Sequence, residues 1–178
     1  SFRDYFRQVT DFEPRRAAQY GIQHFTWLCI NAKEAENVRL SREVIAMIPE
    51  FLDKPNVIGI GEIGLNKNTR NESIIFMEHL ELAVKFDQQI LIHTPHLEDK
   101  YQGTRMILDM LCGDQRLDRT RVLVDHVEEH PIREVLDRSE KPVAFLGSFI
   151  DGVPSALQRR LAHPNAIFLP YQPVGRYL

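Results

Sequence analysis

Six short runs rich in apolar and β-branched residues recur along the chain, with helical patterns between them. The runs are HFTWLCI (24–30), NVIGIGEI (56–63), QILIHT (89–94), RVLVDH (121–126), VAFLGSF (143–149) and AIFLP (166–170). Strands that alternate with helices form βα units, and repeated βα units build a mainly parallel sheet with helix-covered faces. The sequence therefore predicts an α/β protein.

The most regular helical pattern lies between the second and third predicted strands. Over 71–86, Phe76 and Leu80 fall on one face, and Thr69 with Glu72 has the spacing of a capping box ahead of it. Further helical patterns cover 12–20, 41–53, 104–112 (opening at Thr104) and the residues that follow Pro131. His79, in the middle of the first pattern, is expected to be a half-exposed packing residue.

Two folds accommodate this alternation: a doubly wound sheet and a (β/α)8 barrel. A complete barrel usually needs about 250 residues, whereas this chain has 178 residues and about six predicted strands. Neither length nor composition points to a second unit, so residues 1–178 are expected to form a single domain.

Composition and charge narrow the classes of function. A net charge of -3 argues against a protein that binds DNA tightly and without sequence preference, although a local basic groove is still compatible with it. No apolar run is long enough for a membrane span and no signal peptide is visible, so a cytoplasmic location without a membrane partner is expected. Cys29 and Cys112 fit no metal or redox spacing and are expected to be packing residues in a reducing compartment.

Three consecutive predicted strands end in residue types that bind metals, namely Glu62, His93 and His126. Because side chains alternate across a strand, each shares a face with apolar residues before it. The expected inward rows are Ile58, Ile60 and Glu62; Leu91 and His93; and Val122, Val124 and His126. Gly59 and Gly61, on the opposite parity, are expected to leave room for helices outside the sheet.

In a barrel, the last inward residue of each strand points into the mouth where active sites lie. Metal-binding residues at the ends of three neighbouring strands would therefore meet in the active site. Carboxylate and imidazole groups are typical ligands of a divalent metal at a hydrolytic site, and the metal would neutralise the buried carboxylate of Glu62. Taken singly, each residue has a plainer interpretation. A strand-end Glu can be solvated or paired with a basic group, and a His can be hydrogen-bonded in the core or at the surface.

The motifs GEIGLN (61–66), LIHTPH (91–96) and VLVDHVEE (122–129) resemble those of the TatD-type metal-dependent hydrolases of the amidohydrolase superfamily. Other segments, among them FEPRRAAQYGI (12–22) and INAKEA (30–35), are more similar to a divergent TatD-related branch than to the family's central nucleases. The resemblance implies a (β/α)8 fold of the TIM-barrel type, expected to be incomplete in this chain. It also implies a site for one or two divalent metal ions (Zn, Mg or Mn).

The resemblance implies roles for individual residues. Glu62 matches the family's bridging carboxylate and is the expected catalytic residue, and His93 and His126 match two histidine ligands. The implied activity is phosphodiester hydrolysis, DNase-like, by metal-activated water, on a small-molecule or nucleic-acid substrate. The alternatives are a small-molecule ester hydrolase of the same superfamily and a non-catalytic barrel that has lost part of the metal site.

His96 follows His93 by three residues, at the predicted mouth of the barrel. It is the candidate for contact with substrate phosphate or for an extra ligand, and the competing interpretation is a loop histidine that caps backbone groups. His130, four residues after His126, is expected at the start of the following helix rather than in the site.

The chain also departs from the family pattern. No His-x-His pair precedes Glu62, Asn31 stands where the second strand commonly ends in His-Pro, and AIFLPYQPVGRYL has no Asp for the last strand's ligand. Either these parts are missing from the chain, or the protein keeps the shell of the site without its full chemistry. The start at Ser1 and the short length favour the first explanation.

Overall fold

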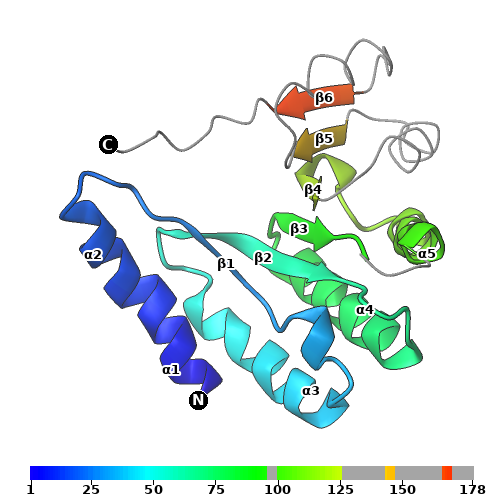
Figure 1. Ribbon diagram of the computed structural model, residues 1–178, viewed down its shortest axis with the longest axis horizontal. Coiled ribbons are helices and arrows are strands. Elements are labelled where there is room, and N and C mark those ends of the chain that lie inside the picture. Colours follow the sequence, from blue (N-terminus) through cyan, green and yellow to red (C-terminus); the bar gives the residue numbers. More distant parts are fainter. Residues whose placement is uncertain (96–99, 126–142, 147–165, 170–178) are drawn as a thin grey trace.

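The computed structural model describes residues 1–95, 100–125, 143–146 and 166–169 (Figure 1). The described residues contain six strands in one parallel sheet, with the order β1-β2-β3-β4-β5-β6. The strands are β1 (Thr26–Leu28), β2 (Val57–Gly64), β3 (Ile90–His93), β4 (Val122–Asp125), β5 (Val143–Leu146) and β6 (Ala166–Leu169). All six predicted strands are confirmed, each within the predicted run or one residue beyond it.

The helices are α1 (Phe2–Arg7), α2 (Glu13–Ala18), α3 (Val38–Met47), α4 (Arg70–Lys85) and α5 (Lys100–Gly113), with the π-helical turn η1 (Gln8–Phe12) and the 3-10 turns η2 (Ala32–Glu34), η3 (Ile48–Phe51) and η4 (Arg119–Arg121). The helical patterns predicted at 12–20, 41–53, 71–86 and 104–112 each contain a helix, but α1 was not predicted and α3 begins three residues before its predicted start. α5 begins a turn before the predicted Thr104, whose buried side chain lies inside the helix rather than at its cap. The helix predicted after Pro131 lies outside the described residues.

The strand order decides between the two folds that the sequence allowed. A doubly wound sheet reverses its strand order at a switch point, whereas this order is sequential throughout the described strands. With right-handed crossovers, a sequential order places the connecting helices on one side of the sheet, as in a barrel. Figure 1 shows α3, α4 and α5 along the same side of the strands. The fold is therefore α/β of the TIM-barrel type.

The hydrophobic core lies between the sheet and these helices. Ile90 and Ile92 of β3 belong to one buried cluster with Phe76 and Leu80 of α4 and Ile107 of α5. Burial of each such side chain contributes roughly 1.5–3 kcal/mol. The apolar stripe predicted for α4 is confirmed, and its capping box is present, because Thr69 Oγ1 accepts from the Glu72 backbone N–H (3.1 Å) and the Glu72 carboxylate accepts from the Thr69 N–H.

The predicted inward row of β4 is wrong. Register partners on neighbouring parallel strands share a face, and the partners here are Ile90 with Val122, Leu91 with Leu123, Ile92 with Val124, and His93 with Asp125. Val122 and Val124 are therefore buried under the helices, and Asp125 is the residue in phase with His93. Alternation fixes which residues share a face, but apolar residues occur on both faces of this strand, so the pattern did not fix which face is inside. His126 lies outside the described residues.

The predicted inward row of β2 is also wrong, because the strand contains a bulge. Ile60 pairs with Ile90 and Ile63 with Ile92, so three steps along β2 match two along β3. Ile60 and Ile63 are both buried in the helix-covered core, and Glu62 between them no longer shares the face of Ile60.

The expectation that helices occupy the room left by the glycines of β2 is wrong as well. A Cβ at Gly59 would meet the Trp27 ring at 2.5 Å, and one at Gly61 would meet Leu91 Cβ at 2.6 Å. Both glycines therefore make room for neighbouring strands of the sheet.

Candidate active site

Glu62 and His93 meet at the carboxyl ends of neighbouring strands. Glu62 Oε1 lies 3.1 Å from His93 Nδ1, and the two side chains are 34% and 15% exposed. The bulge in β2 turns Glu62 toward β3, and the pairing of Gly64 with His93 brings the two strand ends level. The structure thus unites two of the three residues that the sequence pattern marked as metal ligands, and their binding of a metal stays a prediction.

Cys29, directly after β1, packs against the hydrophobic core as the sequence predicted, and it also contacts this site. Its thiol donates a hydrogen bond to the backbone carbonyl of Glu62, with an Sγ–O distance of 3.2 Å. Burial, reinforced by the negative charge of Glu62, raises the pKa of the Cys29 thiol to about 12. The thiol is therefore protonated near neutral pH and acts as a donor. The position of Cys29 at the end of a predicted strand was the only signal that could have placed it here.

Asp125 extends the site toward β4, where sequence reasoning had placed His126. Asp125 is the register partner of His93. Thr94, which follows His93 and is 3% exposed, donates from Oγ1 to the Asp125 backbone carbonyl over 3.2 Å and so ties the two strand ends together. His96 and His126 lie outside the described residues.

A buried carboxylate shapes the loop that follows the GEIGL motif. Glu72 is 2% exposed and accepts hydrogen bonds from the backbone N–H groups of Asn66 (2.9 Å), Lys67 (2.9 Å) and Thr69 (3.4 Å). Several N–H donors converging on one carboxylate compensate for its burial. The loop at the carboxyl end of β2 is thereby attached to the first turn of α4.

His79 is buried, contrary to the half-exposed position expected from the sequence. It is 1% exposed, its Nε2 accepts from the Ile30 backbone N–H (3.2 Å), and its Nδ1 donates to the Ile75 carbonyl (2.8 Å). Burial lowers the pKa of His79 to about 4, an effect that the hydrogen bond to Ile75 partly offsets. The imidazole is therefore neutral and joins α4 to the end of β1.

The donor atoms at the strand ends suit a divalent metal. Glu62 supplies carboxylate oxygen and His93 supplies imidazole nitrogen, the ligand types of Zn²⁺ and Mn²⁺ sites. Within the described part of the chain, no three His, Cys, Asp or Glu side chains are arranged so that they could hold a metal ion. The two residues thus fit part of a metal site, and the other predicted ligand, His126, is outside the described residues.

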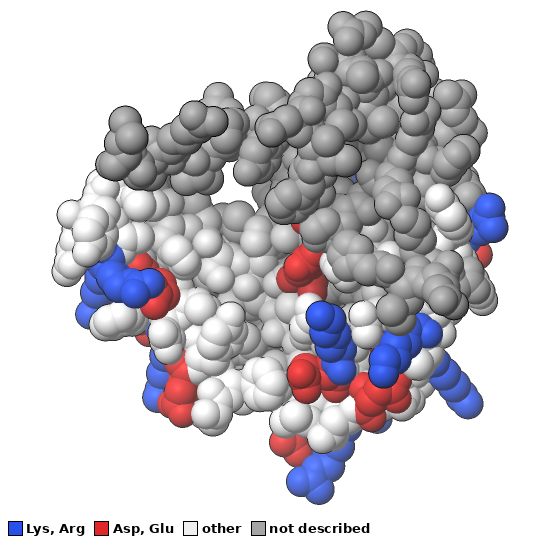
Figure 2. Space-filling model, viewed as in Figure 1, with Lys and Arg blue, Asp and Glu red and all other residues white. Residues whose placement is uncertain are grey.

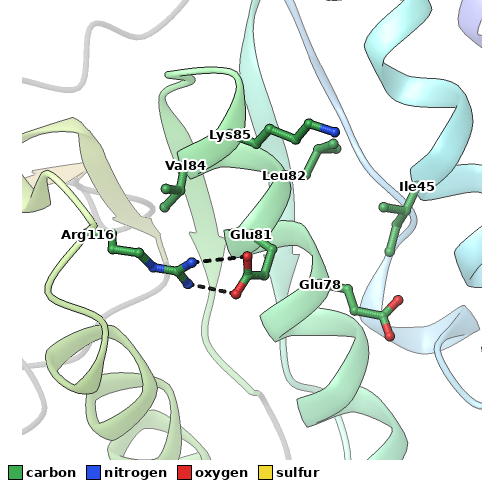
Figure 3. A pocket seen from close by; sticks show the side chains of 7 residues that line it. All are labelled: Ile45, Glu78, Glu81, Leu82, Val84, Lys85 and Arg116. Atoms are coloured by element: carbon green, nitrogen blue, oxygen red, sulfur yellow. Dashed lines mark hydrogen bonds and ion pairs between the residues drawn. The ribbon is translucent and has the colours of Figure 1, made fainter.

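A separate groove of about 380 Å³ lies on the helical side of the molecule (Figure 3). Ile45 of α3, Glu78 and Glu81 of α4, and Arg116 after α5 are among the residues that line it. Three of its charged residues form ion pairs, since Arg116 binds Glu81 at 2.7 Å and Arg42 binds Glu78 at 2.7 Å. The groove contains neither Glu62 nor His93, so it is distinct from the strand-end site.

The described surface carries mixed charge. Figure 2 shows Lys and Arg side chains interspersed with Asp and Glu, with no continuous basic patch among the described residues of this face. This distribution agrees with the net charge of -3. In the part of the chain that the structure describes, no helix combines the length and apolar character needed to cross a membrane.

Two comparisons relate the chain to known proteins, and no family model matches it. An uncharacterized metal-dependent hydrolase from Methanocaldococcus jannaschii is 27% identical over 137 residues, which are 77% of this chain and 53% of that protein. The crystal structure of a TatD-like protein from Archaeoglobus fulgidus superposes with a TM-score of 0.67 at 25% identity, over 93% of this chain and 65% of that one. The chain therefore spans about half the length of the curated relative. The chain is thus similar in sequence to a metal-dependent hydrolase and in fold to a TatD-like protein, which confirms the resemblance to the TatD-type metal-dependent hydrolases.

Proposed function

We propose that this chain carries part of the active site of a metal-dependent hydrolase that cleaves phosphodiester bonds. The observation that supports this most is the contact between Glu62 and His93 at the carboxyl ends of β2 and β3. Both residues belong to the motifs that carry the TatD resemblance, and the Methanocaldococcus jannaschii relative bears the name of a metal-dependent hydrolase.

In this proposal Glu62 and His93 hold one or two divalent ions (Zn, Mg or Mn) together with His126. A bound metal ion supplies Lewis acidity and lowers the pKa of coordinated water. Glu62 would contribute a carboxylate oxygen to the metal site, and His93 would contribute an imidazole nitrogen. His96 is the proposed contact for the phosphate of a small-molecule or nucleic-acid substrate.

A small-molecule ester is the second candidate substrate. The mixed charge of the described surface favours it, because proteins that follow a nucleic-acid backbone rely on a clustered positive surface. An activity panel separates the two candidates. Hydrolysis of single-stranded DNA or of bis(p-nitrophenyl) phosphate supports the phosphodiesterase, and hydrolysis of p-nitrophenyl acetate alone supports the esterase.

The metal dependence is tested with Glu62→Gln and His93→Asn. Glu43→Gln is the matched control, since Glu43 is an exposed residue of α3 paired with Arg39. The two site variants are expected to lose metal-activated hydrolysis by at least about a hundredfold, and the control is expected to keep it. Unchanged metal content and activity in both site variants would reject the proposal.

A further inference from the structure

The backbone of Glu62 is held from a neighbouring strand at the point where the regular ladder is interrupted. Pairing of β2 with β3 shifts register between Ile60 and Ile63, and Glu62 lies inside that interval. On the other side, pairing of β1 with β2 ends at Leu28 and Ile60. Cys29, the first residue after β1, forms the next contact between the two segments through its side chain, because its thiol donates to the Glu62 carbonyl.

The position of Cys29 is itself fixed from the helical side. Ile30, the following residue, is 2% exposed and donates its backbone N–H to the buried imidazole of His79 in α4. Leu28, the preceding residue, is 1% exposed and belongs to the hydrophobic core. Cys29 therefore lies in a segment whose neighbouring residues are both held in place. Its thiol, hydrogen-bonded to the Glu62 carbonyl, restrains the backbone of Glu62.

We propose that Cys29 is a positioning residue for Glu62: its thiol holds the bulged backbone of β2 so that the Glu62 carboxylate faces His93. The proposal rests on the proposed function, since it assigns Cys29 a part in the same metal site. Cys29 touches the main chain of Glu62 rather than its carboxylate, so its role is to orient a ligand. Groups that orient metal ligands in this way typically change metal affinity by about 10- to 100-fold when they are removed.

The hydrogen bond can be measured without any metal. The chain has two cysteines, so a Cys112→Ala variant leaves the S–H stretch of Cys29 as the only one in the infrared spectrum. The expected result is a band shifted to lower wavenumber in the folded protein relative to the same protein in urea. A band at the same wavenumber in both states would overturn the proposal.

Metal titration then tests the consequence for the site. Zn²⁺ affinity is measured by calorimetry for the unaltered protein, Cys29→Ala, Cys29→Ser and Glu62→Gln, with Cys112→Ala as the matched cysteine control. Cys29→Ala is expected to weaken Zn²⁺ binding about tenfold. Cys29→Ser, which keeps a donor, is expected to recover most of that loss, and Cys112→Ala is expected to bind like the unaltered protein.

The outcomes separate the two proposals. If Glu62→Gln abolishes binding while Cys29→Ala leaves the affinity unchanged, the positioning role is wrong and the metal site stands. If Glu62→Gln has no effect, the proposed function is wrong, and the infrared band alone decides whether Cys29 holds Glu62. A lower unfolding midpoint of Cys29→Ala without a change in Zn²⁺ affinity would show a purely structural role and reject the proposal.

Discussion

At the scale of single residues, buried polar side chains determine how the strand ends are held. Glu72 and His79 both lie on α4, and each accepts a backbone N–H from a segment that follows a strand. An unpaired N–H at the buried Ile30 would cost about 1–3 kcal/mol. Sequence reasoning placed Glu72 correctly through its capping-box spacing. It misplaced His79, because nothing in a helical pattern distinguishes a buried histidine with two partners from a half-exposed one.

His79 makes stability depend on pH. Its pKa falls from an ordinary 6.5 to about 4 in the folded protein, so the unfolded chain binds a proton more readily. The contribution of neutral His79 is therefore complete above pH 6.5 and is lost as the pH falls from 6.5 through about 4. The total loss is roughly 3 kcal/mol.

Urea unfolding between pH 7 and pH 4 measures this dependence. His79→Gln, which cannot be protonated, is expected to be less stable at pH 7 and to show a shallower decline toward pH 4. An equal decline in the variant and the unaltered protein would show that His79 does not titrate as the structure requires.

At the scale of elements, the start of α4 is the clearest local signal in the chain. Thr69 caps the helix, and its hydroxyl also donates to Glu36 at 2.6 Å. Thr69→Ala is expected to lower the free energy of unfolding by about 1 kcal/mol. Thr69→Ser keeps the cap and is the control, so equal losses in both variants would contradict the capping role.

The faces of β4 show where sequence patterns stop being informative. The predicted alternation of side chains between the two faces of RVLVDH is correct, but it does not say which face lies under the helices. Only the pairing with β3 shows that Val122 and Val124 are on that face. The bulge in β2 had no sequence signal beyond its glycines. For the same reason Asp125 was missed as the neighbour of His93.

Two alanine substitutions test the observed faces of β4. Val124 is 4% exposed, whereas Leu123 lies on the opposite face of the strand and is half-buried. Val124→Ala is expected to cost about 2 kcal/mol and Leu123→Ala about half as much, although leucine loses more carbon atoms. Chemical denaturation of both variants gives the comparison, and a larger loss for Leu123→Ala would support the face predicted from sequence instead.

At the scale of the whole molecule, the fold was predictable because six predicted strands that alternate with helical patterns leave few topologies. Repetition alone left the doubly wound sheet and the barrel both open. The sequential strand order then selected the barrel type, as the TatD resemblance implied. The site was predictable only in part, since Glu62 and His93 meet as expected, whereas the contact of Cys29 with Glu62 depends on a bulge that no motif encodes.

The central claim is that Glu62 and His93 bind the same metal ion, and anomalous diffraction tests it most directly. Crystals soaked in Zn²⁺ and measured above and below the zinc absorption edge locate the ion independently of activity. The account predicts an anomalous peak about 2.0–2.2 Å from both a Glu62 carboxylate oxygen and a His93 imidazole nitrogen. A zinc peak elsewhere in the protein, with the Glu62–His93 hydrogen bond intact and metal-activated hydrolysis present, would contradict it.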